Sequence, residues 1–455
     1  MRKNQDKLLQ LPVTCVDVCE EGEEPSFAAF PCEIDRDITF KTAGLEAYCL
    51  SNWKPVVFDA FVVAAAVDFC DRLAHRPQLG WGRQFEVGIP VHEPDRWSGQ
   101  LCNLLVDSLG FLTGDRWRLH FRPRKSPANV PGQSNFDIPD PSSAILPFSD
   151  GLDSLMVSAL VERQRKLIRV RLGPERNSRK AWTARQPFAE VPYRIKQDRY
   201  RFTETTSRGR GFKFTMLSGI AAYLSEASDI IIAESGQEAL GPSLVPVGHV
   251  YVDYRNHPRF MAKMGPFLSA LFDRQIGFIF PRVWYTKGET LKEFVDLTNG
   301  EWADTRSCWQ QSRQVSVGGH RRQCGVCAAC MLRRMSVHAA GQDEPSDTYV
   351  WENLSASDVE EGAAPGFESF TEALREYAIA GVLHLEHLAE LSDSPLHAES
   401  KRKAAMQIAP DLGVSSEEAE KKLERMLGQH KLEWRNFVDS LGADSFVTKW
   451  TSGRS

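Results

Sequence analysis

Short apolar runs alternate with helical patterns through the middle of the chain. The runs with the length and composition of buried strands are AILPF (144–148), LIRVRL (167–172), SDIIIAE (228–234) and GFIFP (277–281). A helical pattern extends from Leu155 to Lys166, between the first two runs. Strands that alternate with helices are typical of a parallel, doubly wound sheet. The pattern therefore predicts an α/β core.

The N-terminal part has a looser pattern. Strand-like runs at Phe85–Val91 and Trp117–Phe121 accompany a helical pattern from Asp59 to Ala74, which together predict a small α+β unit. The segment that follows, SPANVPGQSNFDIPDP, is rich in Pro, Ser, Asn and Asp, and this composition is typical of a linker or a long surface loop.

Beyond Val337 the composition becomes polar, and two long helical patterns follow at 367–389 and 415–442. They predict a helical C-terminal region. The expected organisation is thus an N-terminal α+β extension (1–124), a linker (125–143), an α/β core (144–340) and a helical C-terminal extension (341–455).

Composition and charge exclude some classes of function. The formal net charge is -5, with 55 basic and 60 acidic residues, so no global field favours nucleic acid or an anionic membrane as a partner. The longest apolar run, around Val56 to Ala66, is interrupted by Asp59 and is too short to span a bilayer. The start of the chain lacks the apolar stretch of a signal peptide, and ten cysteines without one favour reduced thiols or metal ligands. We therefore expect a cytoplasmic protein.

A candidate phosphate loop directly follows the first core strand and consists of Ser149, Asp150, Gly151, Leu152, Asp153 and Ser154. A strand that turns sharply into a helix leaves the first helical N–H groups unpaired, and the positive end of the helix dipole also favours an anion there. Gly151 lets the backbone approach a phosphate. Ser149 and Ser154 offer hydroxyl donors, and Asp153 is suited to hold Mg²⁺ or to cap the helix. The alternative is a capped turn without a ligand, which uses the same residue types.

Four cysteines have the spacing of a metal site. Cys324, Cys327 and Cys330 lie in C-G-V-C-A-A-C, and Cys308 offers the fourth corner of a tetrahedron. Thiolates select zinc or an iron–sulfur cluster. Bacterial ferredoxin runs end in Cys-Pro, whereas MLRR follows here, which favours Zn²⁺. His320 and His338 are alternatives to Cys308 as the fourth ligand. Four protein ligands leave no open position, so the expected zinc is structural.

The phosphate loop resembles the S-G-G-x-D-S loop of the PP-loop ATP-pyrophosphatases, which split ATP between the α and β phosphates. Asp150 stands where that superfamily has its first glycine, and this adds a carboxylate beside the phosphates. The phosphate loop and the four-cysteine site, called the knuckle below, have Ser207-Arg208-Gly209-Arg210 and Thr286-Lys287 between them. Together these segments resemble the QueC-type 7-cyano-7-deazaguanine synthases over roughly residues 144 to 338.

The resemblance implies roles for several residues. Arg208 and Arg210 are expected to reach the ATP phosphates or an acyl-adenylate, and Lys287 is expected beside the nucleotide. Glu234 and Glu238 stand where the family recognises the deazaguanine edge. A carboxylate suits this role, because it accepts hydrogen bonds from both N–H groups of such an edge. Without the resemblance, the arginines fit a solvated basic loop, the lysine a surface residue and the glutamates a helix cap.

The implied function is an ATP-dependent carbon–nitrogen ligase with ATP, Mg²⁺ and Zn²⁺. It adenylates the carboxylate of 7-carboxy-7-deazaguanine, a small-molecule substrate, and an amine then attacks. Longer QueC-like proteins with extensions occur in bacterial anti-phage systems (Qat-type and type IV CBASS), where a partner protein supplies the amine, and this chain resembles those. Two alternatives stay open: a PP-loop enzyme that modifies tRNA, and a non-catalytic nucleotide-binding module of an assembly.

Overall fold

The computed structural model describes residues 12–27, 29–42, 45, 52–77, 81–127, 140–149, 151–171, 192–246, 250–298, 300–309, 315–367, 369–393 and 395–453. By contacts between residues the chain forms two compact units. Unit 1 comprises Met1–Ser149, Gln164–Ile232 and Pro246–Ile279, and unit 2 comprises Asp150–Arg163, Ala233–Val245 and Phe280–Ser455. Each unit is described by itself.

The N-terminal part of unit 1 contains a four-stranded sheet in the order β2-β1-β4-β5. Its strands are β1 (Val13–Cys19), β2 (Phe30–Glu33), β4 (Gln84–Val91) and β5 (Arg116–Pro123). All neighbours are parallel, an arrangement that the expected α+β pattern did not include. Helices α1 (Pro55–Leu73) and α2 (Gly99–Thr113) connect the strands, and α1 is buried along nearly its whole length.

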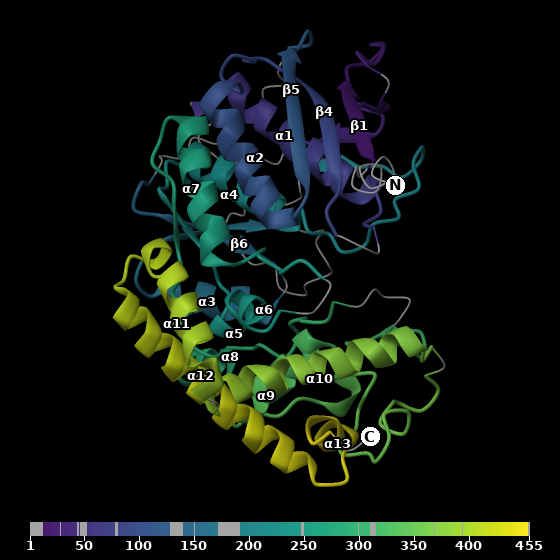
Figure 1. The fold of residues 1–455 in the computed structure, drawn as a ribbon, viewed down its shortest axis with the longest axis vertical. Coiled ribbons are helices and arrows are strands. Elements are labelled where there is room, and N and C mark those ends of the chain that lie inside the picture. Colours follow the sequence, from purple (N-terminus) through teal and green to yellow (C-terminus); the bar gives the residue numbers. More distant parts are fainter. Residues whose placement is uncertain are drawn as a thin grey trace, which may run out of the picture. The chain divides into compact units, whose positions relative to one another are not determined.

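The predicted core strands form a second parallel sheet in unit 1, in the order β10-β9-β6-β7. They are β6 (Ala144–Phe148), β7 (Leu167–Arg171), β9 (Asp229–Ile231) and β10 (Gly277–Ile279). In chain order this is 2-1-3-4 counted from β7, the order of many doubly wound folds. Helices α4 (Arg210–Ser225) and α7 (Pro258–Phe272) pack against the sheet, and α7 also lies beside α2 (Figure 1). The predicted α/β class is confirmed.

The strand order of the second sheet identifies where a ligand is expected. The order reverses between β6 and β9, and ligands of doubly wound sheets bind outside the carboxyl ends of the strands at this reversal. The chain leaves β6 into the predicted phosphate loop and leaves β9 towards Glu234 and Glu238. A further short pair, β3 (Ile38–Phe40) with β8 (Tyr193–Ile195), is antiparallel.

Unit 2 is mainly helical. Its helices are α3 (Leu152–Glu162), α5 (Gly236–Ala239), α6 (Gly241–Leu244), α8 (Lys287–Thr298), α9 (Ala328–Ala339), α10 (Glu372–Asp393), α11 (Ala398–Ile408), α12 (Ser416–Leu441) and α13 (Phe446–Thr451), and β11 (Ser316–Val317) pairs with β12 (His320–Arg321). The C-terminal helical region was predicted, and α12 matches its expected bounds to within one residue. The shorter α11 and α13 were not predicted. Figure 1 shows α12 running alongside α10 and α11.

Hydrophobic clusters hold unit 2 together around the candidate site. Leu152, Leu155 and Met156 of α3 pack with Leu291 and Phe294 of α8, which fixes the start of α3 relative to the start of α8. A second cluster joins the segment around the four cysteines with α10, α12 and α13. The C-terminal helices therefore share a core with the cysteine segment.

The expected domain boundaries at 124, 143 and 340 stay a prediction, because the compact units alternate along the chain. The expected linker falls mostly on residues 128–139, which lie outside the described residues. None of the helices in the described part of the chain has the length and apolar character needed to cross a membrane.

Candidate functional site

The predicted phosphate loop forms the start of α3. Gly151 is the N-cap, in extended conformation, and the helix begins at Leu152, three residues earlier than the sequence pattern indicated. Asp153 and Ser154 thus lie in the first helical turn, where backbone N–H groups have no helical acceptor. The Ser154 hydroxyl donates to the Gly151 carbonyl at 3.1 Å. Ser149 is exposed at the end of β6, and Asp150 lies outside the described residues.

Lys287 brings two other predicted site residues together within unit 2. Its Nζ lies 2.7 Å from Asp153 Oδ2 and 2.8 Å from Glu238 Oε1. The lysine side chain is 1% exposed, whereas those of Asp153 and Glu238 are 18% and 24% exposed. The structure joins three separately predicted residues in one cluster: Asp153 of the phosphate loop, Glu238 after β9 and Lys287 at the start of α8.

The charges of this cluster do not balance at high pH. The pKa of Glu238 is raised to about 8, mainly by burial and also by the negative charges of Asp153 and Glu234, against the opposing effect of Lys287. Burial alone would lower the pKa of Lys287, but the two carboxylates raise it above its usual value. At neutral pH the cluster therefore contains a charged Lys287 and a Glu238 that retains its proton.

The backbone of Lys287 is held as firmly as its side chain. The predicted capping box is present: Thr286 N–H donates to Glu289 Oε2 at 2.9 Å, and Glu289 N–H donates to Thr286 Oγ1 at 3.1 Å. The Lys287 N–H donates to Gln237 Oε1 at 2.8 Å. Gln237 was not predicted, because glutamine beside an acidic pair carries no distinctive sequence signal.

The predicted arginines belong to unit 1, at the start of α4. Arg208 Nη1 lies 3.4 Å from Asp253 Oδ1, and its guanidinium lies over the Trp81 ring. Arg210 stacks on Phe214, 4.7 Å from the ring centre. Gly209 N–H donates to Asp71 Oδ2 at 2.8 Å, which ties the segment to α1. Their predicted contact with ATP phosphates stays a prediction.

The four predicted cysteines converge in unit 2. The Sγ atoms of Cys308, Cys324, Cys327 and Cys330 all lie within 4.8 Å of one another. A tetrahedral zinc with Zn–S bonds of about 2.3 Å separates its sulfurs by about 3.8 Å, and Cys324 Sγ lies 3.8 Å from Cys330 Sγ. Backbone N–H groups of Cys324 and Cys327 donate to Cys308 Sγ and Cys324 Sγ at 3.2 and 3.3 Å, which stabilises thiolates. The donor set fits zinc.

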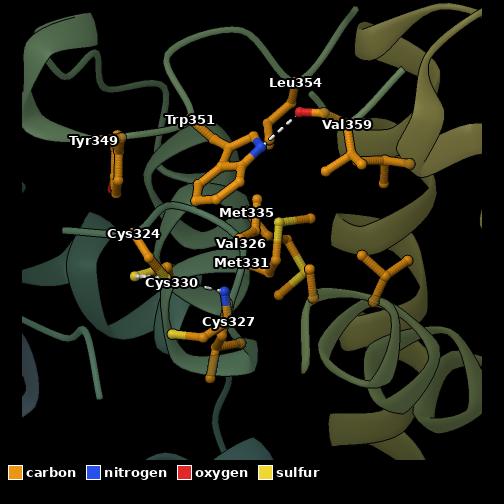
Figure 2. Packing of buried hydrophobic residues seen from close by; sticks show 14 of the residues in the cluster. Cys324, Val326, Cys327, Cys330, Met331, Met335, Tyr349, Trp351, Leu354 and Val359 are labelled. Carbon is orange, nitrogen blue, oxygen red and sulfur yellow. Dashed lines mark hydrogen bonds between the residues drawn. The ribbon is translucent and has the colours of Figure 1, made fainter. Parts of the chain in front are cut away.

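Local structure explains how the knuckle forms. Gly318 and Gly319 both have positive φ and close the β11–β12 hairpin, as a type I′ turn requires. Cys327 is the N-cap of α9, so Cys330 lies in its first turn. Figure 2 shows Cys324, Cys327 and Cys330 beside the buried Trp351.

The histidine alternatives are not part of this cluster. Among the described residues, the four cysteines form the one group of His, Cys, Asp or Glu side chains close enough to bind a metal. His338 instead lies against the Phe437 ring, and His320 is exposed on β12. The prediction of Cys308 as the fourth corner therefore agrees with the geometry.

A comparison with protein-family models matches residues 214–341 to the queuosine biosynthesis protein QueC. Residues 214–341 thus match a QueC-type domain. The match covers Glu234, Glu238, Lys287 and the four cysteines, while the phosphate loop and the two arginines precede it. QueC proteins are ATP-dependent carbon–nitrogen ligases that act on a small deazaguanine substrate, which supports an enzyme of this type. Comparisons with curated proteins and with solved structures found no match.

Proposed function

We propose that this chain is a QueC-like ligase that adenylates the carboxylate of 7-carboxy-7-deazaguanine and passes the acyl group to an amine. The observation that carries the proposal is the Lys287 cluster, because it unites the first turn after β6 with residues inside the QueC-type match. The four-thiolate site supports the same family.

In the proposed first step, a carboxylate oxygen of the substrate attacks the α phosphorus of ATP, and pyrophosphate leaves. Lys287 exchanges its bond to Asp153 for one to a phosphate oxygen, so that its charge stabilises the transition state. Asp153 is the residue that we expect to hold Mg²⁺, which prefers carboxylate oxygens. The amine nitrogen then attacks the acyl carbon, and AMP leaves.

The direct test is incubation of the protein with ATP, Mg²⁺ and 7-carboxy-7-deazaguanine. We expect AMP and pyrophosphate in equal amounts, with ammonia as the first acceptor to try. Formation of ADP, or no nucleotide product at all, would remove the proposal. ATP binding measured by calorimetry without turnover would instead support the non-catalytic nucleotide-binding module.

The acceptor and the biological setting are part of the same proposal. The added N-terminal and C-terminal segments favour a QueC-like protein of an anti-phage system, with a partner protein as the amine donor. Intact-mass spectrometry of a partner encoded beside this chain is the test. An addition of deazaguanine size would support the protein acceptor, and an unchanged mass together with a small-molecule amide or nitrile would show that ammonia is the acceptor.

A pH dependence follows from the raised pKa of Glu238. Because Glu238 is neutral below about pH 8 and ionised above it, its negative charge opposes ATP phosphates only at high pH. We expect the affinity for ATP to fall as pH rises through about 8, and Glu238→Gln to flatten this profile. Calorimetric titrations with ATP, in buffers from about pH 6 to about pH 9.5, measure this affinity. A wild-type affinity that does not change over this range would contradict the assignment.

A further inference from the structure

Helix α12 of the C-terminal region directs buried polar side chains at the start of α8. His430 and Glu433 are 0% and 4% exposed, although both are polar. Buried polar groups are costly unless they are hydrogen-bonded, so their partners indicate what they are used for. In both cases the partners lead to Lys287 or to its neighbour Thr286.

His430 is the end of a directed chain of hydrogen bonds. The Lys287 N–H donates to Gln237 Oε1 at 2.8 Å, so the Gln237 amide nitrogen faces His430 Nδ1, 2.9 Å away, and donates to it. The other ring nitrogen, Nε2, then carries the proton and donates to the Leu385 carbonyl at 2.9 Å. Burial lowers the pKa of His430 to about 4, so the ring is neutral and this direction is fixed.

Glu433 contacts the N-terminus of α8 from the same face of α12. Its Oε1 accepts from the Thr286 hydroxyl at 2.6 Å and from Gln429 Nε2 at 3.0 Å. Its Oε2 is buried and has no hydrogen-bond partner among the residues that the structure describes. A Cβ at position 288 would lie 2.9 Å from Glu433 Oε1, so Gly288 is what allows the carboxylate this close to the first turn. The positive end of the α8 dipole favours a carboxyl group there.

These contacts exceed what packing requires. The neighbouring residues Met426, Leu423 and Leu427 already bury the apolar face of α12, and apolar residues at 430 and 433 would avoid the cost of burying polar groups. The polar chain instead fixes the backbone at residues 286 and 287, from which the Lys287 side chain projects to Asp153 and Glu238.

We infer that His430 and Glu433 are positioning residues for Lys287, so that the C-terminal helix α12 is required for the ligase reaction and is not a separate module. The inference rests on the proposed function of Lys287. It predicts that removing the hydrogen bonds of His430 lowers the rate of the chemical step and leaves substrate binding largely intact. A small misplacement of a catalytic group costs about 100-fold in rate.

The test compares His430→Leu with His430→Asn in the full-length chain. The leucine variant removes both hydrogen bonds, and the asparagine variant keeps an acceptor near the position of Nδ1. We expect kcat to fall about 100-fold in His430→Leu with KM for ATP within about threefold, and to recover at least about tenfold in His430→Asn. Lys421→Ala, at an exposed position of α12, is the matched control and should behave as wild type. A kcat of His430→Leu within about twofold of wild type would overturn the inference.

A second measurement separates this inference from the proposed function. If wild type releases no AMP, the proposed function fails, and hydrogen exchange of the 286–290 amides then decides the positioning. We expect these amides to exchange faster in His430→Leu than in Lys421→Ala, and equal exchange would overturn it. If His430→Leu does not fold, Gln237→Met interrupts the same chain one residue nearer to Lys287, with the same expected outcomes.

Discussion

Replacing Lys287 by Met is expected to lower ligase activity by about 10²–10³-fold and to destabilise the fold. The substitution removes the cation that pairs with Asp153 and Glu238 and leaves two carboxyl groups facing an apolar side chain. Removal of one partner from a buried ion pair costs about 3–5 kcal/mol, and protonation of Glu238 brings the cost towards the lower end. Loss of a preorganised donor to a phosphate lowers kcat by about 10²–10³-fold.

The destabilisation should depend on pH with a definite sign. The folded pKa of Glu238 is raised from 4.5 to about 8, so the folded state binds its proton more tightly than the unfolded state. Stability linked to this group is fully present below pH 4.5 and is lost as pH rises through about 8. Without Lys287 the pKa of Glu238 rises further. The loss of stability caused by Lys287→Met should therefore be larger at about pH 9 than at about pH 6.

Urea unfolding at the two pH values measures the stability, and release of AMP measures the activity. Lys292→Ala is the matched control, because Lys292 lies in the same helix and is exposed. Wild-type stability and turnover in Lys287→Met would show that the cluster has neither role. Loss of stability with normal turnover would reduce the lysine to a structural part of the fold.

The sequence predicted those features that local spacing determines. The apolar run 144–148 is β6 to the residue, the Thr286–Glu289 capping box is present, and the cysteine spacing produces the four-thiolate cluster. Each of these depends on residues that are close in sequence or carry a restrictive chemistry. The start of α3 was placed three residues late, because Asp153 and Ser154 suit a loop turn as well as the first turn of a helix.

Features that depend on distant contacts could not be predicted in this way. The parallel order of the N-terminal sheet is set by the crossovers through α1 and α2, for which the strand pattern has no signal. The contacts of Thr286 with Glu433 and of Gln237 with His430 join segments that lie far apart in the chain. A helical pattern predicts which face of α12 is apolar, but it does not reveal that two polar residues on that face are buried against α8.

For the two arginines, the sequence motif predicted their position in the fold but not the residues that their side chains contact. The Ser-Arg-Gly-Arg segment opens α4 as the resemblance implied. However, Arg208 lies beside Asp253 and over Trp81, and burial lowers its pKa. Asp253 lies far from Arg208 along the chain, so two segments that are separate in sequence are neighbours in unit 1.

Cys327→Ser is expected to release zinc and to unfold the knuckle together with part of the C-terminal helical region. A structural zinc site contributes on the order of 10 kcal/mol to local folding, and loss of one thiolate removes most of this. Cys327 lies in the hydrophobic cluster that also contains Trp351 of the knuckle segment and Trp434 of α12. Because one core serves both, the disruption should reach α12 and hence the start of α8.

Three measurements test the expected loss of zinc and the unfolding that follows it. Elemental analysis should find one zinc per wild-type chain and none in Cys327→Ser. Tryptophan fluorescence should shift to longer wavelength as the buried Trp351 and Trp434 become exposed, and proteolysis should cut the C-terminal region faster. Prolonged treatment of wild type with a strong chelator should reproduce these changes, since we expect a zinc ion with four protein ligands to be released slowly.

The matched control is Cys102→Ser, because Cys102 is a half-buried thiol of α2 in unit 1, outside the metal cluster. This variant should keep its zinc and its C-terminal protection, which separates the loss of a metal ligand from the loss of a thiol. Iron in place of zinc would mean that the four thiolates hold an iron–sulfur site. A metal-free wild type with normal stability would mean that the thiols pack without an ion, and Cys327→Ser would then cost only the few kcal/mol of a buried polar substitution, about 1–3 kcal/mol.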